Sequence, residues 1–244
     1  MIVVTGATGN VGRSLVAALA RAGERVTAVS RGIAPVRLPG GAVRIRADLA
    51  EPESLRPALA GAEALFLHDG GTGGHGFDAR AVLAGARDAG VARVVLLSSQ
   101  GVVTRPDSPS HGGAMRALED AVRESGLAWT ILRAGGFASN AYAWAESVRT
   151  ERTVAAPFGD VGLPVVDPAD IAEVAAVALR KDEHTGRIYE LNGPAAVTPR
   201  QQAEAIGAAL GEPVRFVELT RAAAYARMTA YMPEPVVATT LAVL

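Results

Sequence analysis

Residues 5–12 read Thr-Gly-Ala-Thr-Gly-Asn-Val-Gly, and this stretch decides the fold class of the 244-residue chain. It follows a short apolar, β-branched run at Met1–Thr5. It leads into Asn10–Arg21, where apolar residues recur at the spacing of one helix face. The sequence therefore predicts a strand, a tight glycine turn and a helix at the start of the chain.

The three glycines of this turn are spaced G-x-x-G-x-x-G. Gly6 permits the tight turn, Gly9 lets a pyrophosphate approach the backbone, and Gly12 lets the helix pack closely on the strand. The N-terminus of the helix then offers N–H groups and a partial positive charge to phosphates. The context predicts a dinucleotide site, and the alternative is a tight turn that binds nothing. The residues expected to contact the cofactor here are Gly6, Thr8, Gly9, Asn10, Val11 and Gly12.

Beyond this turn, strand and helix patterns alternate, which predicts βαβ units and a parallel sheet. The expected strands are Met1–Thr5, Arg25–Ser30, Ala42–Ala47, Ala62–His68, Ala92–Ser98 and Ala128–Leu132. The expected helices are Asn10–Arg21, Pro52–Leu59, Phe77–Ala89 and Met115–Ser125. A smaller mixed region follows, with helices at Ala169–Arg180 and Arg200–Leu210 and strands at Arg187–Leu191 and Val214–Val217.

These patterns predict a doubly wound α/β fold with a parallel sheet, helices on both faces and a small C-terminal α/β substrate lobe. The expected division is a nucleotide-binding domain at residues 1–150 and a C-terminal portion at 151–244. The C-terminal portion is expected to complete part of the sheet and to form the lobe.

The composition excludes several classes of protein. Apolar residues make up 49% and charged residues 20%, so the chain can bury a core and is not disordered. A net charge of −1 gives no basic excess for nucleic acid or an anionic membrane. The lack of cysteine excludes disulfides, thiol catalysis and cysteine-ligated metals. No apolar run is long enough to cross a bilayer and no export signal is recognisable, so we expect a cytoplasmic protein.

The second predicted strand ends in Val29-Ser30-Arg31, without the carboxylate that NAD sites use for the ribose 2′-hydroxyl. Ser30 and Arg31 could instead hold a 2′-phosphate, so we expect NADP(H) as the preferred cofactor and NAD(H) as a possible one. The alternative is that Arg31 is a solvated loop residue. Asp48 and Leu49 either contact the adenine or cap the following turn.

A second glycine-rich stretch follows the fourth predicted strand. Its first residues are expected beside the adenosine or nicotinamide ribose, and they are His68, Asp69 and Gly70. Histidine and carboxylate spacing in a glycine loop is too common to support a metal site, so no metal is expected.

Several further motifs carry a resemblance to a known family. Besides the glycine turn, they are Asp48-Leu49, Leu65-Phe66-Leu67, Ala89–Val95, Leu97-Ser98-Ser99, Glu124–Arg133, Gly136-Phe137 with Asn140, Val166–Ala172 and Tyr189–Pro194. With them the chain resembles the NmrA-like group of the atypical short-chain dehydrogenase/reductases over most of its length. The resemblance implies a Rossmann domain that binds NADP(H) or NAD(H), with a small substrate lobe. Members of the family include quinone and azo-dye reductases and redox-sensing regulators that bind the nucleotide.

The better-known short-chain reductases use a Tyr-x-x-x-Lys pair, in which tyrosine donates the proton and lysine lowers its pKa. By the family spacing, His111 stands at the tyrosine position and Met115 at the lysine position. The only lysine of the chain is Lys181, and all four tyrosines lie elsewhere. We therefore expect hydride transfer without this pair, to an acceptor such as a quinone, whose reduced anion solvent can protonate.

Other polar residues could assist this reaction. His111 could donate a proton, and Ser98 or Ser99 could hydrogen-bond a substrate carbonyl or the nicotinamide. The alternatives are an exposed loop histidine and ordinary caps at the end of a strand. The residues expected beside the nicotinamide are Arg133, Ala134 and Gly135. The residues expected to contact a planar substrate are Phe137, Asn140, Tyr142 and Trp144, which could alternatively form a core between the lobes.

The predicted function is an NADP(H)-dependent oxidoreductase that transfers hydride to a planar small-molecule acceptor, as a monomer or homodimer. One alternative is a non-catalytic NAD(P)-binding redox sensor that acts through a protein partner. Another is a related isomerase or epimerase.

Overall fold

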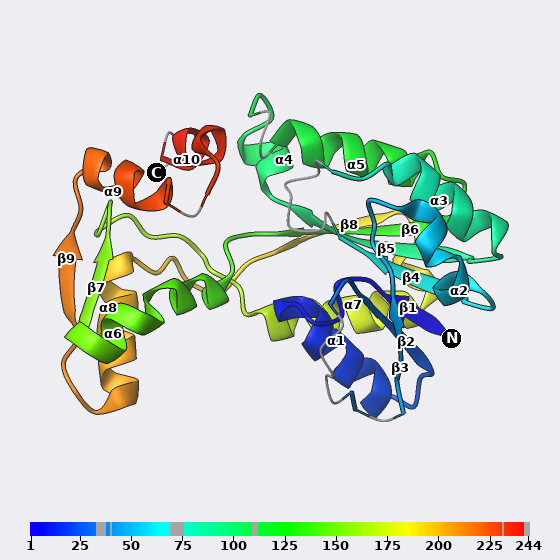
Figure 1. The fold of residues 1–244 in the computed structure, drawn as a ribbon, viewed down its shortest axis with the longest axis horizontal. Coiled ribbons are helices and arrows are strands. Elements are labelled where there is room, and N and C mark those ends of the chain that lie inside the picture. Colours follow the sequence, from blue (N-terminus) through cyan, green and yellow to red (C-terminus); the bar gives the residue numbers. More distant parts are fainter. Residues whose placement is uncertain (33–37, 40, 69–75, 109–111, 231, 242–244) are drawn as a thin grey trace. The chain divides into compact units, whose positions relative to one another are not determined.

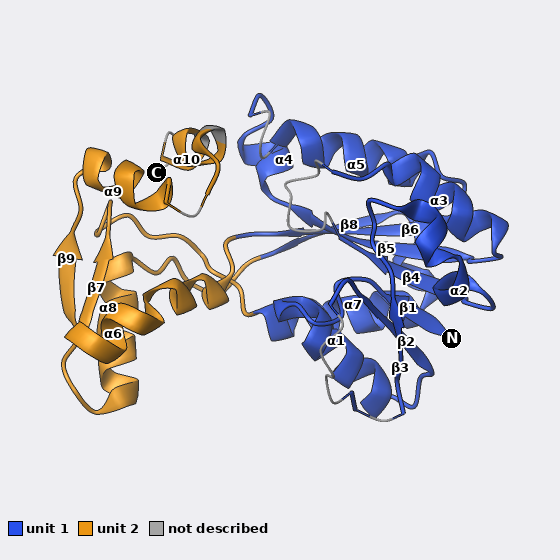
Figure 2. Cartoon of the chain, in the orientation of Figure 1, with its two compact units in different colours: residues 1–135, 168–191 blue, residues 136–167, 192–244 orange. Residues whose placement is uncertain are grey.

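The structure of the protein is a computed structural model that describes residues 1–32, 38–39, 41–68, 76–108, 112–230 and 232–241. Two compact units share the chain (Figure 2). The first contains residues 1–135 and 168–191, and the second contains residues 136–167 and 192–244. The expected boundary at residue 150 lies inside a helix of the second unit, and residues 168–191 return to the first unit.

Among the described residues, the first unit contains a seven-stranded parallel sheet in the order β3-β2-β1-β4-β5-β6-β8 (Figure 1). Its strands are β1 (Ile2–Val4), β2 (Val26–Ser30), β3 (Val43–Arg46), β4 (Ala64–Leu67), β5 (Arg93–Ser99), β6 (Ala128–Ala134) and β8 (Arg187–Leu191). All four residues of β4 are buried, as expected for a strand covered by helices on both faces. The predicted doubly wound α/β fold is confirmed.

Helices lie on both faces of this sheet (Figure 1). On one face α1 (Asn10–Arg21) packs against α7 (Pro168–Arg180), and on the other α3 (Ala79–Asp88) packs against α5 (Ala114–Arg123). The apolar side of α1 faces inward because Leu15, Val16 and Leu19 recur at helical spacing and are buried. The short helices of this unit are η1 (Pro52–Leu55), α2 (Arg56–Leu59), α4 (Gly101–Thr104) and η4 (Asp182–His184).

The strand order places the glycine turn at a specific point of the sheet. β1 pairs with β2 on one side and with β4 on the other, so successive connections run in opposite directions from it. Ligands of open parallel sheets bind at the carboxyl ends of the strands beside such a reversal. The turn after β1 therefore lies where a nucleotide is expected.

The second unit contains elements that the sequence patterns predict only in part. Its α8 (Pro199–Leu210) and β9 (Arg215–Glu218) lie within two residues of the predicted bounds. A capping box starts α8, since Thr198 accepts from the Gln201 N–H and the Gln201 side chain accepts from the Thr198 N–H. The elements that the patterns missed here are η3 (Ala138–Trp144), α6 (Ala145–Glu151), β7 (Thr153–Ala156), α9 (Arg221–Met228) and α10 (Glu234–Leu241). β7 and β9 pair in parallel as a separate two-stranded sheet.

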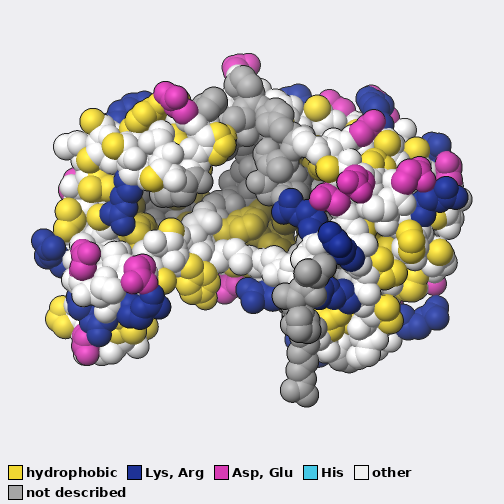
Figure 3. Space-filling model, in the orientation of Figure 1, with side chains coloured by type: hydrophobic (Ala, Val, Ile, Leu, Met, Phe, Trp, Pro, Cys, Tyr) yellow, Lys and Arg dark blue, Asp and Glu magenta, His cyan; other side chains and the backbone are white. Residues whose placement is uncertain are grey.

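Across the described ranges, no helix is long and apolar enough to span a membrane. On the face drawn in Figure 3, basic and acidic side chains are interspersed on each unit. This arrangement agrees with the balanced charge of the sequence.

Candidate functional site

The glycine turn between β1 and α1 is shaped by close contacts. Gly6 has a φ of +60°, and a Cβ on it would lie 2.2 Å from Nε2 of His68. A Cβ on Gly12 would lie 2.1 Å from the Gly6 carbonyl oxygen. Gly9 is the N-cap of α1 and brings no side-chain hydrogen bond to it. The first turn of α1 can therefore offer its N–H groups to phosphate oxygens.

His68 adjoins this turn from the carboxyl end of β4. Its side chain is half-buried, and its imidazole occupies the space that a side chain on Gly6 would need. The two strand ends are tied together because both the N–H and the hydroxyl of Thr5 donate to the Phe66 carbonyl oxygen, at 3.2 and 2.8 Å. His68 thus lies beside the predicted phosphate site, while Asp69 and Gly70 lie outside the described residues.

The carboxyl end of β2 gathers a buried hydroxyl and two cations. Ser30 is 6% exposed, and its Oγ has no hydrogen-bond partner. Arg31 follows it and is exposed. Arg44 of β3 reaches the same place, because its guanidinium donates to the Gly32 carbonyl oxygen. A buried hydroxyl without a partner is costly, so this edge is suited to a ligand that brings an acceptor.

Asp48 follows β3 and closes a turn of its own chain. Its Oδ1 accepts from the Ala50 N–H at 3.1 Å. The Ser54 hydroxyl donates to the Asp48 carbonyl and accepts from the Asp48 N–H, both at 3.0 Å. This arrangement is the capping role that the sequence left open, and Leu49 packs against the main apolar core. Contact of either residue with an adenine stays a prediction.

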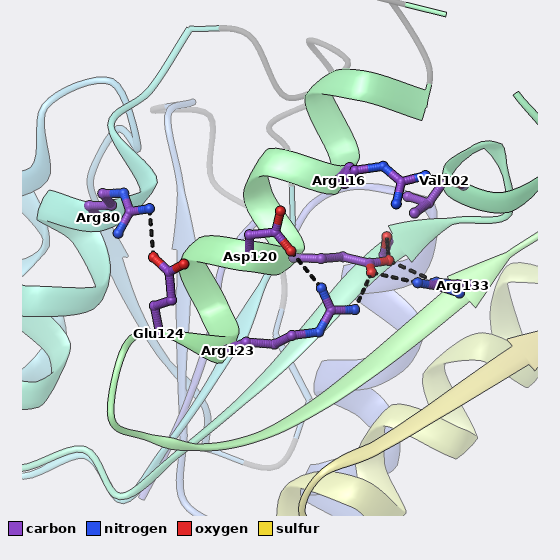
Figure 4. Close-up of polar contacts among 9 residues, drawn as sticks. Arg80, Val102, Arg116, Asp120, Arg123, Glu124 and Arg133 are labelled. Carbon is purple, nitrogen blue, oxygen red and sulfur yellow. Dashed lines mark hydrogen bonds and ion pairs between the residues drawn. The ribbon is translucent and has the colours of Figure 1, made fainter. Parts of the chain in front are cut away.

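Glu119 of α5 is a charged residue with no exposed surface. Its carboxylate accepts from Ser98 at 2.6 Å, from Arg133 at 2.9 and 2.7 Å, and from Arg123 at 2.7 Å. Figure 4 shows Arg123 and Arg133 pointing toward the same carboxylate. Arg123 also donates to Asp120 at 2.7 Å. Ser98 and Arg133 are register partners near the ends of β5 and β6. The carboxylate therefore joins α5 to the carboxyl edge of the sheet.

The charges of this cluster settle its protonation. Burial raises the pKa of the Glu119 carboxyl, but hydrogen bonds from Arg133 and Ser98, with the charge of Arg133 and the hydrogen bond from Arg123, outweigh burial. The pKa of Glu119 therefore lies below its ordinary value, and the hydrogen bond to Glu119 raises the pKa of Arg133. Glu119 is an anion at neutral pH, and the Ser98 hydroxyl already donates to it.

The sequence patterns did not identify Glu119, Arg123 or Arg44 as part of any site. Glu119 and Arg123 are four residues apart on a helix, which is also the spacing of an ordinary solvated ion pair. The signal that Glu119 faces inward is the apolar character of its neighbours on the helix. Three of them are buried: Leu118, Ala121 and Val122.

The remaining catalytic candidates are placed as follows. Ser99 Oγ accepts from the Gly101 N–H at 3.0 Å and so caps the start of α4. His111 lies outside the described residues. The roles of His111, Ser98 and Ser99 toward a substrate stay predictions.

Ala134 and Gly135 have backbone groups that are bonded at the end of the sheet. The Ala134 carbonyl accepts from the Gln100 N–H at 3.0 Å, and the Gly135 N–H donates to the Leu191 carbonyl at 2.9 Å. These bonds hold the carboxyl end of β6 against its neighbours. Their contact with a nicotinamide stays a prediction.

The lysine and the tyrosines lie away from this edge of the first unit. Lys181 lies between α7 and η4, ahead of the amino end of β8. The Tyr189 hydroxyl is bonded to Nδ1 of His184 at 2.8 Å. The other tyrosines are Tyr142 and Tyr225 in the second unit, and Tyr231 outside the described residues. Within the described part of the first unit, no tyrosine and lysine therefore meet at the carboxyl ends of the strands.

The expected substrate residues lie in the second unit in different surroundings. Trp144 packs against the apolar cluster of Val148, Val154 and Ala203. Tyr142 is 78% exposed, and Asn140 is exposed too. Phe137 is half-buried and forms an isolated parallel bridge with Val166. Trp144 thus serves a core, and contact of these four residues with a substrate stays a prediction.

Comparison with known proteins identifies a family match. The sequence model of a family described as NAD(P)H-binding matches residues 6–182. The chain is 39% identical over 246 residues to the (4-alkanoyl-5-oxo-2,5-dihydrofuran-3-yl)methyl phosphate reductase of Streptomyces griseus, covering 97% of this chain and 83% of the relative. It is 35% identical over 238 residues to the NAD(P)H azoreductase of Xenophilus azovorans, covering 96% and 82%.

Solved structures show the same fold. The NADPH-dependent quinone oxidoreductase of Escherichia coli in complex with NADPH is 26% identical, with a TM-score of 0.78. The match covers 97% of this chain and 85% of that one.

Proposed function

Since the chain belongs to the NAD(P)H-binding family and is an NAD(P)H-dependent oxidoreductase of the atypical short-chain type, we propose that it transfers hydride from NADPH to a planar, conjugated acceptor such as a quinone. Contact of Phe137, Asn140, Tyr142 and Trp144 with the substrate is part of this proposal.

The residues at the carboxyl edge fit a dinucleotide with a 2′-phosphate. The glycine turn leaves room where Gly6 and Gly12 lack a Cβ, and the uncapped start of α1 suits a pyrophosphate. The orphan hydroxyl of Ser30, with the charges of Arg31 and Arg44, suits a 2′-phosphate, because a phosphate accepts from both kinds of donor. The bound nicotinamide supplies the hydride.

One observation carries the choice of acceptor. Ser98, near the carboxyl end of β5, is expected to contact the acceptor, but its hydroxyl donates to Glu119, which is held as an anion. A simple ketone would need a positioned acid, because its reduction gives a strongly basic alkoxide. A quinone gives a stabilised anion that solvent can protonate. In this proposal Ser98, Glu119 and Arg133 hold the sheet edge and give up no proton.

The names of the relatives fit this class of acceptor. They denote an azo compound, a quinone and an unsaturated furanone, each of which has a conjugated system that accepts hydride. We therefore assign the acceptor of this protein to the class of conjugated compounds.

The test has a binding stage and a turnover stage. NADPH and NADH are titrated into the protein while nucleotide fluorescence is followed, and a panel of neutral quinones is then added. We expect tighter binding of NADPH and quinone-dependent oxidation. Binding without turnover on any quinone would favour the non-catalytic sensor, and no binding of either nucleotide would overturn the proposal.

A charge variant tests the 2′-phosphate assignment. Arg31→Gln should weaken NADPH binding by roughly tenfold to a hundredfold, since a hydrogen bond to a charged group is worth about 1.5–3 kcal/mol, and should leave NADH binding unchanged. Arg25→Gln, an equally exposed arginine just ahead of the amino end of β2, is the matched control. An equal loss for both nucleotides would remove Arg31 from the 2′-phosphate site.

A further inference from the structure

The segment between α4 and α5 contains a partly buried arginine that forms no ion pair with any of the described residues. Arg105 follows the last residue of α4, which itself starts just after the carboxyl end of β5. Its Nε is buried and has no hydrogen-bond partner. Among the described residues no carboxylate forms an ion pair with it, and burial lowers the pKa of its guanidinium. The fold therefore removes part of this cation from water, and none of the described residues accepts a hydrogen bond from its Nε.

A second buried donor lies three residues further along. The Ser108 Oγ is buried and likewise has no hydrogen-bond partner among the residues that the structure describes. The one acid of this stretch, Asp107, is exposed. Two adjacent polar side chains without partners are unusual, because buried polar groups are nearly always bonded.

The backbone of this segment is held closely. The Ser108 N–H donates to the Arg105 carbonyl at 3.1 Å, and the Gly113 N–H donates to the Ser108 carbonyl at 2.9 Å. A Cβ on Gly112 would lie 1.9 Å from the Arg105 carbonyl oxygen, so the residue two positions ahead of α5 lies directly against it. Backbone hydrogen bonds thus hold the two residues within one turn.

A neighbouring arginine gives a contrast within the same region. Arg116 of α5 donates to the Val102 carbonyl of α4 at 2.8 Å, and its residue is exposed (Figure 4). Its donors have both a protein partner and water. Arg105 differs from it in having a buried donor with neither.

We infer that Arg105 and Ser108 form an anion subsite, which receives a carboxylate, sulfonate or phosphate carried by the hydride acceptor. The segment follows β5 at the same edge of the sheet as the glycine turn, which is the edge where the acceptor of the proposed reaction must lie. The guanidinium would supply charge and a donor, and the hydroxyl a second donor. This subsite deepens the proposed function and rests on it for the identity of its ligand.

The first test compares two acceptors that differ by one charge, 1,4-naphthoquinone and 1,4-naphthoquinone-2-sulfonate. Arg105→Gln should raise KM for the sulfonate by about tenfold or more, since one hydrogen bond to a charged group is lost. KM for the neutral quinone and the Kd for NADPH should stay within about twofold. Arg116→Gln, which removes the same charge, should leave both acceptors unchanged. Equal effects of Arg105→Gln on both quinones, or none on the sulfonate, would overturn the subsite.

The second test does not need turnover. Inorganic phosphate is titrated by calorimetry into protein that is saturated with NADP⁺, so that the cofactor phosphate sites are already filled. Phosphate should bind, Arg105→Gln and Ser108→Ala should each weaken that binding by at least about tenfold, and Arg116→Gln should not. No phosphate binding to the unaltered protein, or the same affinity in all variants, would overturn the subsite.

The two tests separate the subsite from the proposed function. A protein that reduces neither quinone contradicts the function, while phosphate binding that depends on Arg105 still supports the subsite. Arg105→Gln should leave the melting temperature nearly unchanged, because the side chain is only partly buried and its buried Nε has no hydrogen bond to lose among the described residues. If that variant fails to fold, the Ser108→Ala result decides the question.

Discussion

Two polar clusters contact the same helix, α5, and they are opposite in one respect. Around Glu119 the carboxylate accepts four hydrogen bonds from three side chains. At the turn ahead of α5, Arg105 Nε and Ser108 Oγ are buried donors that have no hydrogen-bond partner among the described residues. A buried cluster whose polar atoms are all hydrogen-bonded stabilises the fold. Buried donors without acceptors at a sheet edge can instead donate hydrogen bonds to a ligand. Whether a buried polar atom already has a hydrogen-bond partner therefore distinguishes a structural role from a binding role, and the kind of amino acid does not.

The largest effect is expected at the satisfied cluster. Glu119→Gln removes the charge that compensates Arg133 and Arg123, so the free energy of unfolding should fall by about 3–5 kcal/mol. Urea unfolding followed by circular dichroism measures the change. Asp120→Asn is the control, since Asp120 is 50% exposed and should cost less than about 1 kcal/mol. Equal losses for the two variants would mean that the buried carboxylate has no special role.

The next largest effect is on nucleotide binding. The glycine turn can receive a ligand because its glycines have no Cβ atoms. Gly12→Ala places a Cβ 2.1 Å from the Gly6 carbonyl and should weaken NADPH binding about a hundredfold, or about 2.7 kcal/mol. Fluorescence titration measures it. Gly85→Ala lies inside α3 with open space around it and should raise stability by about 0.5–1 kcal/mol with unchanged binding. Unchanged binding in Gly12→Ala would contradict the assignment of the turn.

A pair of serine variants sharpens the comparison directly. Ser98→Ala leaves Glu119 with one donor fewer and should cost about 1–3 kcal/mol of stability. Ser30→Ala removes a buried hydroxyl that has no partner, so stability should change by less than about 0.5 kcal/mol while NADPH binding weakens. Chemical unfolding of the unliganded variants and nucleotide titration give the two readouts. A larger loss of stability for Ser30→Ala than for Ser98→Ala would contradict the distinction between hydrogen-bonded and unbonded buried hydroxyls.

The smallest effect is a dependence on pH. The folded pKa of Glu119 is lowered, so its stabilising contribution is complete above the ordinary carboxyl pKa of 4.5. The contribution is then lost as pH falls through the lowered folded value. Melting temperatures measured from pH 7 to pH 3 should therefore fall more steeply for the unaltered protein than for Glu119→Gln below about pH 4.5. Parallel curves would show that the carboxyl is not held as an anion.

The sequence predicted the first unit well because its elements depend on local patterns. The strand predicted at Ala92–Ser98 contains an unbroken apolar run, and the helix predicted at Asn10–Arg21 has apolar residues at helical spacing. Both were placed within a residue of the observed bounds. The second unit was harder to predict. β7 is four residues long and pairs with β9, which lies some sixty residues later. A strand that depends on so distant a partner cannot be predicted from a local pattern.

The site was predictable where backbone geometry decides and less so where side chains meet. Gly6 and Gly12 follow from spacing, because a missing Cβ is a property of the residue itself. Glu119 of α5 is recognised as part of a buried cluster only from its hydrogen bonds to Ser98 of β5 and Arg133 of β6, which the folded sheet brings beside it. Arg105 looks like any surface arginine in the sequence, and its lack of a partner is a property of the folded chain alone.

The return of residues 168–191 to the first unit has a consequence for synthesis of the chain. α7 covers the same face as α1, and β8 completes the sheet beside β6, yet both leave the ribosome after residues 136–167. At roughly 5–20 residues per second, residues 135–186 take roughly 3–10 s to appear. During that time the nascent chain exposes the apolar side of α1 and an open edge of β6, which are surfaces that chaperones bind. Synonymous codons that slow translation of residues 136–167 should therefore lower the yield of soluble protein without altering its sequence.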